Sequence, residues 1–130
     1  MEQLLIFLIG AAGYGAIELI WRGYTHWTML ITGAVCFLLL YNIFMLMENA
    51  SPGIKAIIGC LTITLIEFIA GMIINVQFGL GVWDYSDLPF NLYGQICLPY
   101  SVLWFALCFP LVFFCKWLNS LDFMSKKTRA

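Results

Sequence analysis

The stretch Ile54–Val76, IKAIIGCLTITLIEFIAGMIINV, sets the fold class, because it is apolar over a length that crosses a lipid bilayer. A helix rises about 1.5 Å per residue, so roughly 20 residues span a hydrocarbon core of about 30 Å. The whole chain of 130 residues is 63% hydrophobic and 10% charged, whereas about 25% of the residues in a soluble domain are charged. We therefore predict a membrane protein.

Three further apolar runs have a similar length. We predict an all-α, polytopic membrane protein that forms a single transmembrane domain over residues 1–130, with four transmembrane helices at about residues 4–20, 27–47, 54–76 and 94–117. The longest connection between these runs, residues 77–90, is expected to form an interfacial loop.

The distribution of basic residues predicts the orientation. Arg22 alone lies on the side of the first and third connections, whereas five basic residues lie on the side of the termini: Lys55, Lys116, Lys126, Lys127 and Arg129. Because cytoplasmic segments carry the excess of Lys and Arg, we predict cytoplasmic termini. The first and third connections then lie outside, and the net charge of only −1 argues against nucleic acid as a partner.

Polar residues of three helices and two connections gather at this outer end. We predict that they bind a substrate or an ion; the candidates are Glu18, Arg22, His26, Glu67, Asn75, Trp83, Asp84, Tyr85, Asn91 and Gln95.

Glu67 is the sharpest of these candidates, because it lies in the middle of an apolar run. A charged side chain there costs on the order of 3 kcal/mol, so it should face the protein interior, find a partner or take up a proton. Intramembrane ionisable residues mark ion or substrate paths. The alternative is that Glu67 is a structural strut. We expect Glu18, Arg22 and Asp84 to form one network with Glu67 or just above it.

Residue chemistry also suggests how the third connection folds. Asp84 is expected to reach Arg22 or His26. The rings of Trp83 and Tyr85 suit the membrane interface, so the loop should cover the outer mouth of the bundle and keep both rings out of bulk water. Asn91 can cap the fourth helix.

Small residues at helical spacing predict how the helices pack. In the first helix Ala11, Gly15, Glu18 and Arg22 share one face, and in the fourth helix a second small face contains Gly94, Cys97, Ser101, Trp104 and Cys108. We expect the first and fourth helices to pack through these faces, since small residues let helices approach closely in lipid.

Short similarities between the two halves suggest a duplicated helical hairpin. The sequence IELI at residues 17–20 resembles IEFI at residues 66–69, and GAVCF at residues 33–37 resembles GQICL at residues 94–98.

Longer motifs carry a family resemblance. The run WDYSDLPFNLYGQICLPYSVLW at Trp83–Trp104, together with IEFIAG and Asn75 before it and ELIWRG near the start, resembles the bacterial proteins named putative ABC transporter permeases, type IV, a CmpB-like family. This resemblance implies a small multi-pass protein of the bacterial cytoplasmic membrane. The sequence contains no GxxxxGK[ST] phosphate loop, so ATP hydrolysis in such a system would need a separate ATPase subunit.

Three classes of function are consistent with these features. The first is a transport protein or permease subunit, surrounded by lipid and assembled as a homo-oligomer, whose carboxylates bind a cation, a proton or a small substrate. The second is a membrane enzyme that uses Glu18, His26 or Asp84 as acid or base on a lipid-linked substrate. The third is a structural or accessory subunit. We expect no cofactor, and one histidine without a ligand-spaced pair gives little support to a metal site.

Overall fold

The computed structural model describes residues 2–121 of the chain. Four helices are long and apolar enough to cross a membrane, which confirms the predicted all-α class with four candidate spans. Their bounds lie within five residues of the predicted ones: α1 (Glu2–Arg22), α2 (Trp27–Leu46), α3 (Pro52–Gly71) and α4 (Leu98–Ser120). The predicted basic tail, with Lys126, Lys127 and Arg129, lies outside the described residues.

Helix α3 does not end where the sequence predicts, because its last turns change type. After Gly71 the chain continues as a π-helix, η1 (Met72–Gln77), and the backbone N–H of Phe78 donates to the carbonyl of Ile73 at 3.0 Å. Such wide turns are rare and often lie at functional sites. Here the wide turn contains Asn75, one of the predicted site residues.

Helix α4 begins four residues later than the predicted start at Gly94. Gly94 has φ +72°, a left-handed conformation that interrupts a helix. Residues 91–97 instead form a small antiparallel hairpin of β1 (Asn91–Leu92) and β2 (Ile96–Cys97). The third connection is therefore longer than residues 77–90 and ends at Cys97.

Local side-chain chemistry fixes the starts of α2 and α3. At α2 the Nδ1 atom of His26 accepts a hydrogen bond from the backbone N–H of Thr28 at 3.2 Å. At α3 the hydroxyl of Ser51 accepts from the N–H of Ile54 at 3.3 Å, and Pro52 follows at the first helical position. Both are standard ways of satisfying the free N–H groups of a helix start.

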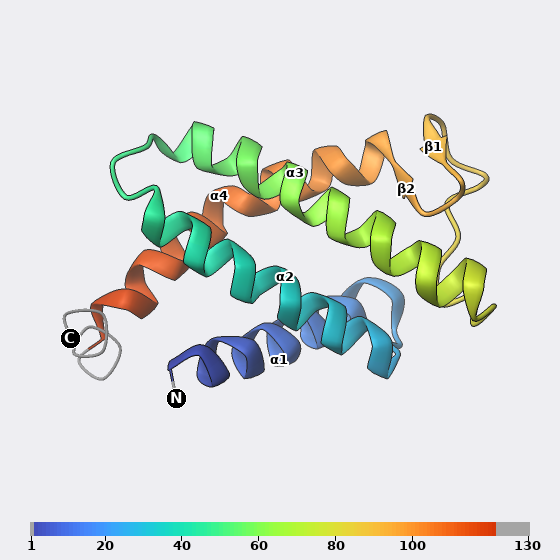
Figure 1. The fold of residues 1–130 in the computed structure, drawn as a ribbon, viewed down its shortest axis with the longest axis horizontal. Coiled ribbons are helices and arrows are strands. Elements are labelled where there is room, and N and C mark those ends of the chain that lie inside the picture. The colour runs from blue at the N-terminus through green and yellow to red at the C-terminus, as the bar shows by residue number, and fades with distance from the viewer. Residues whose placement is uncertain (1, 122–130) are drawn as a thin grey trace.

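The four helices run up and down and form two hairpins, α1 with α2 and α3 with α4 (Figure 1). Figure 1 also separates two ends of the bundle. The start of α1, the end of α4 and residues 47–51 lie at one end, which we call the terminal end. Residues 23–26 and 78–97 lie at the other, which we call the site end.

The predicted pairing of the first and fourth helices is wrong, because each helix packs mainly against its own hairpin partner. A Cβ atom on Gly10 would lie 3.1 Å from the backbone of Ala34 in α2, and one on Gly59 in α3 would lie 2.7 Å from Sγ of Cys108 in α4. Small residues thus bring helices close together, as expected in lipid, but within the hairpins.

The two proposed repeat marks behave differently. Glu18 and Glu67 both lie four residues before the last residue of their helices, α1 and α3, and both are buried. In contrast, residues 33–37 lie inside α2, whereas residues 94–98 form a turn and strand β2 and only reach the start of α4. Residues 17–20 and 66–69 therefore occupy equivalent positions in their helices, whereas residues 33–37 and 94–98 do not. The duplication of a helical hairpin stays a prediction.

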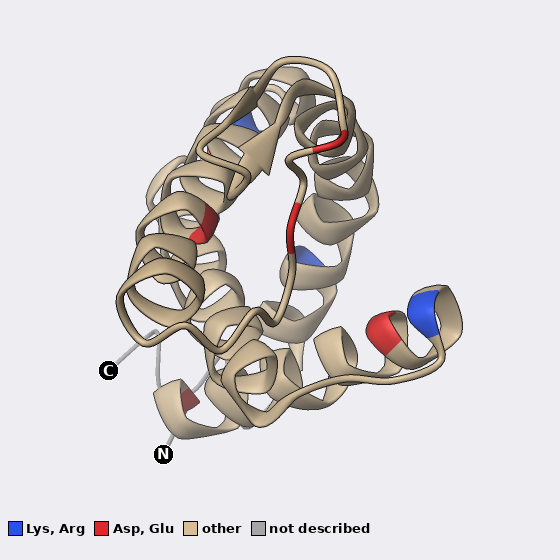
Figure 2. Ribbon diagram, turned by 90° about the vertical axis from the view of Figure 1, so that its right-hand side faces the viewer, with Lys and Arg blue, Asp and Glu red and all other residues tan. Residues whose placement is uncertain are grey.

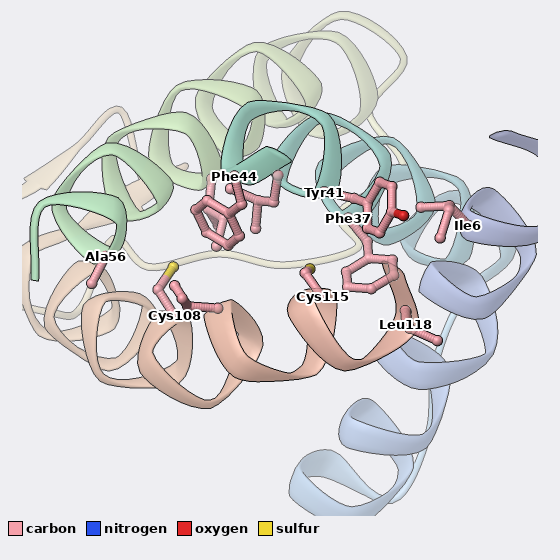
Figure 3. Packing of buried hydrophobic residues seen from close by; sticks show 11 residues of the cluster. Ile6, Phe37, Tyr41, Phe44, Ala56, Cys108, Cys115 and Leu118 are labelled. Atoms are coloured by element: carbon pink, nitrogen blue, oxygen red, sulfur yellow. The ribbon is translucent and has the colours of Figure 1, made fainter. Parts of the chain in front are cut away.

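The hydrophobic core lies toward the terminal end and receives side chains from all four helices. Figure 3 shows Phe37, Tyr41 and Phe44 of α2 facing Cys108 and Cys115 of α4. These five side chains are at least 93% buried, so the terminal half of the bundle is closely packed.

The outer surface of the bundle is apolar. Large hydrophobic side chains point outward along every helix; Ile20 and Leu46, for example, are each 86% exposed. Charged residues are sparse among the described residues (Figure 2). A surface of this kind is stable in contact with lipid chains but not with water.

Gly33 gives a direct test of the α1–α2 packing. Its Cβ would lie 2.5 Å from Cβ of Tyr14, an atom close to the backbone of α1 that cannot move independently. We expect Gly33→Ala to destabilise the protein by about 1–3 kcal/mol through overpacking and to lower its melting temperature in detergent. The control is Gly53→Ala in α3, where a Cβ would meet no atom within 4 Å. Equal melting of the two variants would contradict this packing.

Candidate functional site

Glu67 faces the interior of the bundle and is only 5% exposed. Its Oε2 accepts a hydrogen bond from the Tyr85 hydroxyl at 3.1 Å, and its Oε1 accepts from the Trp104 indole N–H at 3.4 Å. Within residues 2–121 the only ion pair is that of Arg22 with Glu18. The Glu67 carboxylate therefore has two neutral donors and, in the described part of the chain, no cation.

The Tyr85 hydroxyl is a suitable donor for a carboxylate. Burial, supported by the neighbouring charge of Glu67, raises the pKa of Tyr85 above its ordinary value. The phenol therefore keeps its proton at neutral pH and donates a hydrogen bond to Glu67.

Glu18 and Arg22 form a separate ionic contact at the end of α1. Their side chains meet at 3.0 Å, one helical turn apart, and Nη1 of Arg22 also donates to the carbonyl of Val82 at 3.2 Å. Arg22 thus links α1 to the third connection and neutralises Glu18. Its guanidinium lies 4.5 Å from the ring centroid of Tyr24.

A layer of aromatic rings lies between these two carboxylates; we call Tyr14, Tyr85, Tyr100 and Trp104 the aromatic layer. The Tyr85 and Tyr100 rings stack at 4.7 Å between centroids, and Trp104 lies 6.4 Å from both Tyr14 and Tyr100. The layer joins α1, α4 and the third connection. Two of its members, Tyr85 and Trp104, are the donors to Glu67.

Two neighbouring cavities border this layer: all four rings line one of them, and Tyr14 and Trp104 line both. The first, of about 170 Å³, is lined mainly by apolar residues of α1, α2 and α4, and Glu67 is its only charged lining residue. The second, of about 210 Å³, is lined by Glu18 and Arg22. The cavities share six lining residues, which are Tyr14, Ile17, Met29, Trp83, Trp104 and Leu107. A cavity is therefore present between α1 and α4, where the sequence predicted direct packing.

Hydrogen bonds hold the third connection against the helices. Asn75 accepts from the backbone N–H of Val82 at 2.6 Å and donates to the side chain of Gln95 at 2.9 Å. The Trp83 indole donates to the carbonyl of Gln95 at 3.0 Å, and Trp83 is only 6% exposed. These contacts agree with the expectation that Trp83 and Tyr85 are kept out of bulk water.

The predicted contacts of Asp84 are not formed. Asp84 does not pair with Arg22 or His26; its Oδ1 accepts from the backbone N–H of Ser86 at 2.9 Å, which lowers the pKa of Asp84 below its ordinary value. His26 caps α2. The expected network of Glu18, Arg22, Asp84 and Glu67 is thus divided, since the residues are held by different partners.

Asn91 has a different role from the predicted one. It does not cap α4, which begins after Cys97. Its amide donates to the carbonyls of Ser86 and Leu88, and its Oδ1 accepts from the N–H of Gly94 at 3.1 Å. Asn91 therefore shapes the hairpin before α4, and His26, Asp84 and Asn91 all stabilise local turns.

Two residues beside Glu67 were not among the predicted site residues. Trp104 lies on the predicted small face of the fourth helix, and Tyr14 precedes Glu18 by one helical turn on the first. Helical periodicity places each on a buried face, but it does not show that those faces meet at Glu67. No sequence signal connects Tyr14 with the far half of the chain.

Comparison with known proteins places this fold and site in context. Residues 4–129 match a family model described as putative ABC-transporter type IV. The match covers nearly the whole chain and includes every candidate site residue. No solved structure matches the chain.

The contacts of Asn75 can be tested by substitution. We expect Asn75→Ala to leave the Val82 N–H and the Oε1 atom of Gln95 without these partners, at a cost of about 1–3 kcal/mol, and to increase protease cleavage within residues 78–97. The matched control is Asn42→Ala, which removes hydrogen bonds to Gln3 and Leu38 near the terminal end. If the control increases cleavage in this segment as strongly, Asn75 is not what holds it.

Proposed function

We propose that this chain, which belongs to the putative ABC-transporter type IV family, is a transport protein that binds a cation or a proton at Glu67. The single observation that carries this proposal is a cavity that reaches a buried carboxylate without a cation partner among residues 2–121. A carboxylate in this setting is stabilised by any mobile positive charge that enters the cavity.

The surroundings of Glu67 support reversible binding. Two neutral donors, Tyr85 and Trp104, lower the cost of the ionised carboxylate without neutralising it. A permanent salt bridge would leave no charge for a ligand. Glu67 can therefore exist both empty and loaded, which a transport site requires.

The other predicted site residues receive supporting roles in this proposal. Trp83, Asn75 and Gln95 position the third connection so that Tyr85 reaches Glu67. Glu18 and Arg22 line the second cavity together with the aromatic layer. His26, Asp84 and Asn91 hold local turns of the first and third connections.

We also propose an assembly and a location. The cavity that the four helices line has a volume of only about 170 Å³, so we propose that transport of a larger substrate needs further copies of the chain. If ATP drives the process, its hydrolysis belongs to a separate subunit, because the sequence has no phosphate loop. The location proposed is the bacterial cytoplasmic membrane, where lipids surround the apolar helix faces.

Glu67→Gln tests the transport role. The amide keeps the shape of the side chain but cannot exchange a proton or neutralise a cation. We expect the variant to melt within a few degrees of the wild type. In reconstituted vesicles it should lose the uptake of protons or cations that a pH or sodium gradient drives.

Glu2→Gln is the matched control for this experiment. Glu2 is also buried, at 6% exposure, and also accepts a hydrogen bond from a tyrosine hydroxyl, that of Tyr41. Uptake should survive this change. A Glu67→Gln variant with a lowered melting temperature and unchanged uptake would identify Glu67 as a strut.

The proposed orientation has its own test. The start of α1 and the end of α4 lie at the same end of the bundle (Figure 1), and the basic residues favour a cytoplasmic position for that end. A green fluorescent protein fused after Ala130 should fluoresce in bacterial cells, whereas alkaline phosphatase at the same point should be inactive. The opposite pair of results would place the site end in the cytoplasm.

A further inference from the structure

We infer that the cavity beside Glu67 takes a small organic monocation with an apolar body. The inference rests on the proposed function, because it names the class of cation that the Glu67 site would bind. It draws on four properties of the cavity, which are its charge, the number of its ligand atoms, its walls and its size.

The charge of the cavity selects a single positive charge. Glu67 is its only charged lining residue, and the nearest other carboxylate in the described network, Glu18, is neutralised by Arg22. A dication bound here would keep an uncompensated positive charge in an apolar interior, which is as costly as the lone carboxylate. A monocation leaves the occupied cavity neutral.

The ligand atoms argue against a metal ion. No group of three or more His, Cys, Asp or Glu side chains that could hold a metal is found within residues 2–121. Hard cations need about six oxygen ligands, and Zn²⁺ needs about four N, O or S ligands. Both oxygens of Glu67 already accept hydrogen bonds, from Tyr85 and Trp104. An ammonium group needs far fewer partners, since one carboxylate and aromatic faces suffice.

The walls favour an apolar body beside the charge. Aliphatic side chains such as Ile63, Leu107 and Leu111 line part of the cavity, and aromatic side chains line much of the rest. Tyr14 and Trp104 add two aromatic rings, and both line the second cavity as well. Aromatic faces attract organic cations, and the attraction grows where water is excluded. The walls and the carboxylate therefore suit the two ends of one amphipathic molecule.

The size of the cavity limits the ligand. An engineered apolar cavity of about 150 Å³ in another protein binds benzene, and the cavity beside Glu67 is about 170 Å³. A six-membered ring with one short ammonium arm fills such a space. Benzylammonium is therefore a suitable probe, and benzyl alcohol is its uncharged analogue of nearly the same shape.

Equilibrium dialysis of both probes against the full chain in detergent tests the inference, with protein-free micelles subtracted. We expect saturable binding of benzylammonium that Glu67→Gln weakens by about tenfold or more, and binding of benzyl alcohol that this variant leaves unchanged. Glu2→Gln is the control and should bind benzylammonium like the wild type. Equal binding of the two probes by the wild type, or no effect of Glu67→Gln, would overturn the inference.

A second variant keeps the test decisive if Glu67→Gln does not fold. Gly13 lines the cavity, and a Cβ there would meet no atom within 4 Å. Gly13→Leu retains Glu67 but fills the space, so it should abolish binding of both probes. Gly53→Leu, at an equally open glycine in α3, should not. Benzylammonium that binds Gly13→Leu as it binds the wild type would show that it lies elsewhere.

This experiment separates the ligand class from the proposed function. Flux that depends on Glu67 without binding of benzylammonium would overturn the inference and leave transport intact. Binding of benzylammonium that depends on Glu67, without flux of any cation, would support the ligand class and overturn transport.

Discussion

A carboxylate in an apolar interior must be solvated by the protein itself, and the hydrogen bonds to Glu67 meet this requirement. One donor, Trp104, comes from α4, and the other, Tyr85, comes from the third connection. The connection can deliver Tyr85 only if it folds back from the end of α3 into the bundle. Three features accompany this fold of the connection: the wide turn of η1, the hydrogen bonds of Asn75 and the burial of Trp83. The third connection thus supplies, through Tyr85, one of the two hydrogen bonds that stabilise the buried carboxylate of Glu67.

The cavity beside Glu67 follows from how the small residues are used. Glycines let α1 approach α2 and let α3 approach α4. Each helix makes its closest contacts within its own hairpin, and the two hairpins meet through the hydrophobic core. Between α1 and α4 a cavity remains, and the larger rings of Tyr14 and Trp104 are among the side chains that line it. Close packing within the hairpins and a cavity between them are therefore two results of the same arrangement, and Phe37, Leu40 and Ile63 belong to the core and also line the cavity.

Glu2 shows that burial of a carboxylate is not by itself a sign of function. Glu2 is as buried as Glu67 and also accepts from a tyrosine hydroxyl, that of Tyr41. Tyr41, however, belongs to the hydrophobic core and also donates to Asn119, so it ties α2 to α4 in a closely packed region. Neither cavity is lined by Glu2. The difference between a strut and a candidate binding site lies in the free volume beside the charge.

The sequence by itself determined the membrane class, the four helices, their bounds to within a few residues and the burial of Glu67, because length, hydropathy and the cost of a charge in lipid act locally. It did not determine which helices pair. Small residues occur in several helices, and their spacing along the sequence does not show which helix each small face contacts. Nor did it find Tyr14, or exclude contact of Asp84 with Arg22 and His26. These features depend on how far the third connection folds back and on which side chains meet across the hairpins. Only the tertiary structure decides them, because contacts between residues distant in sequence depend on packing that local periodicity does not encode.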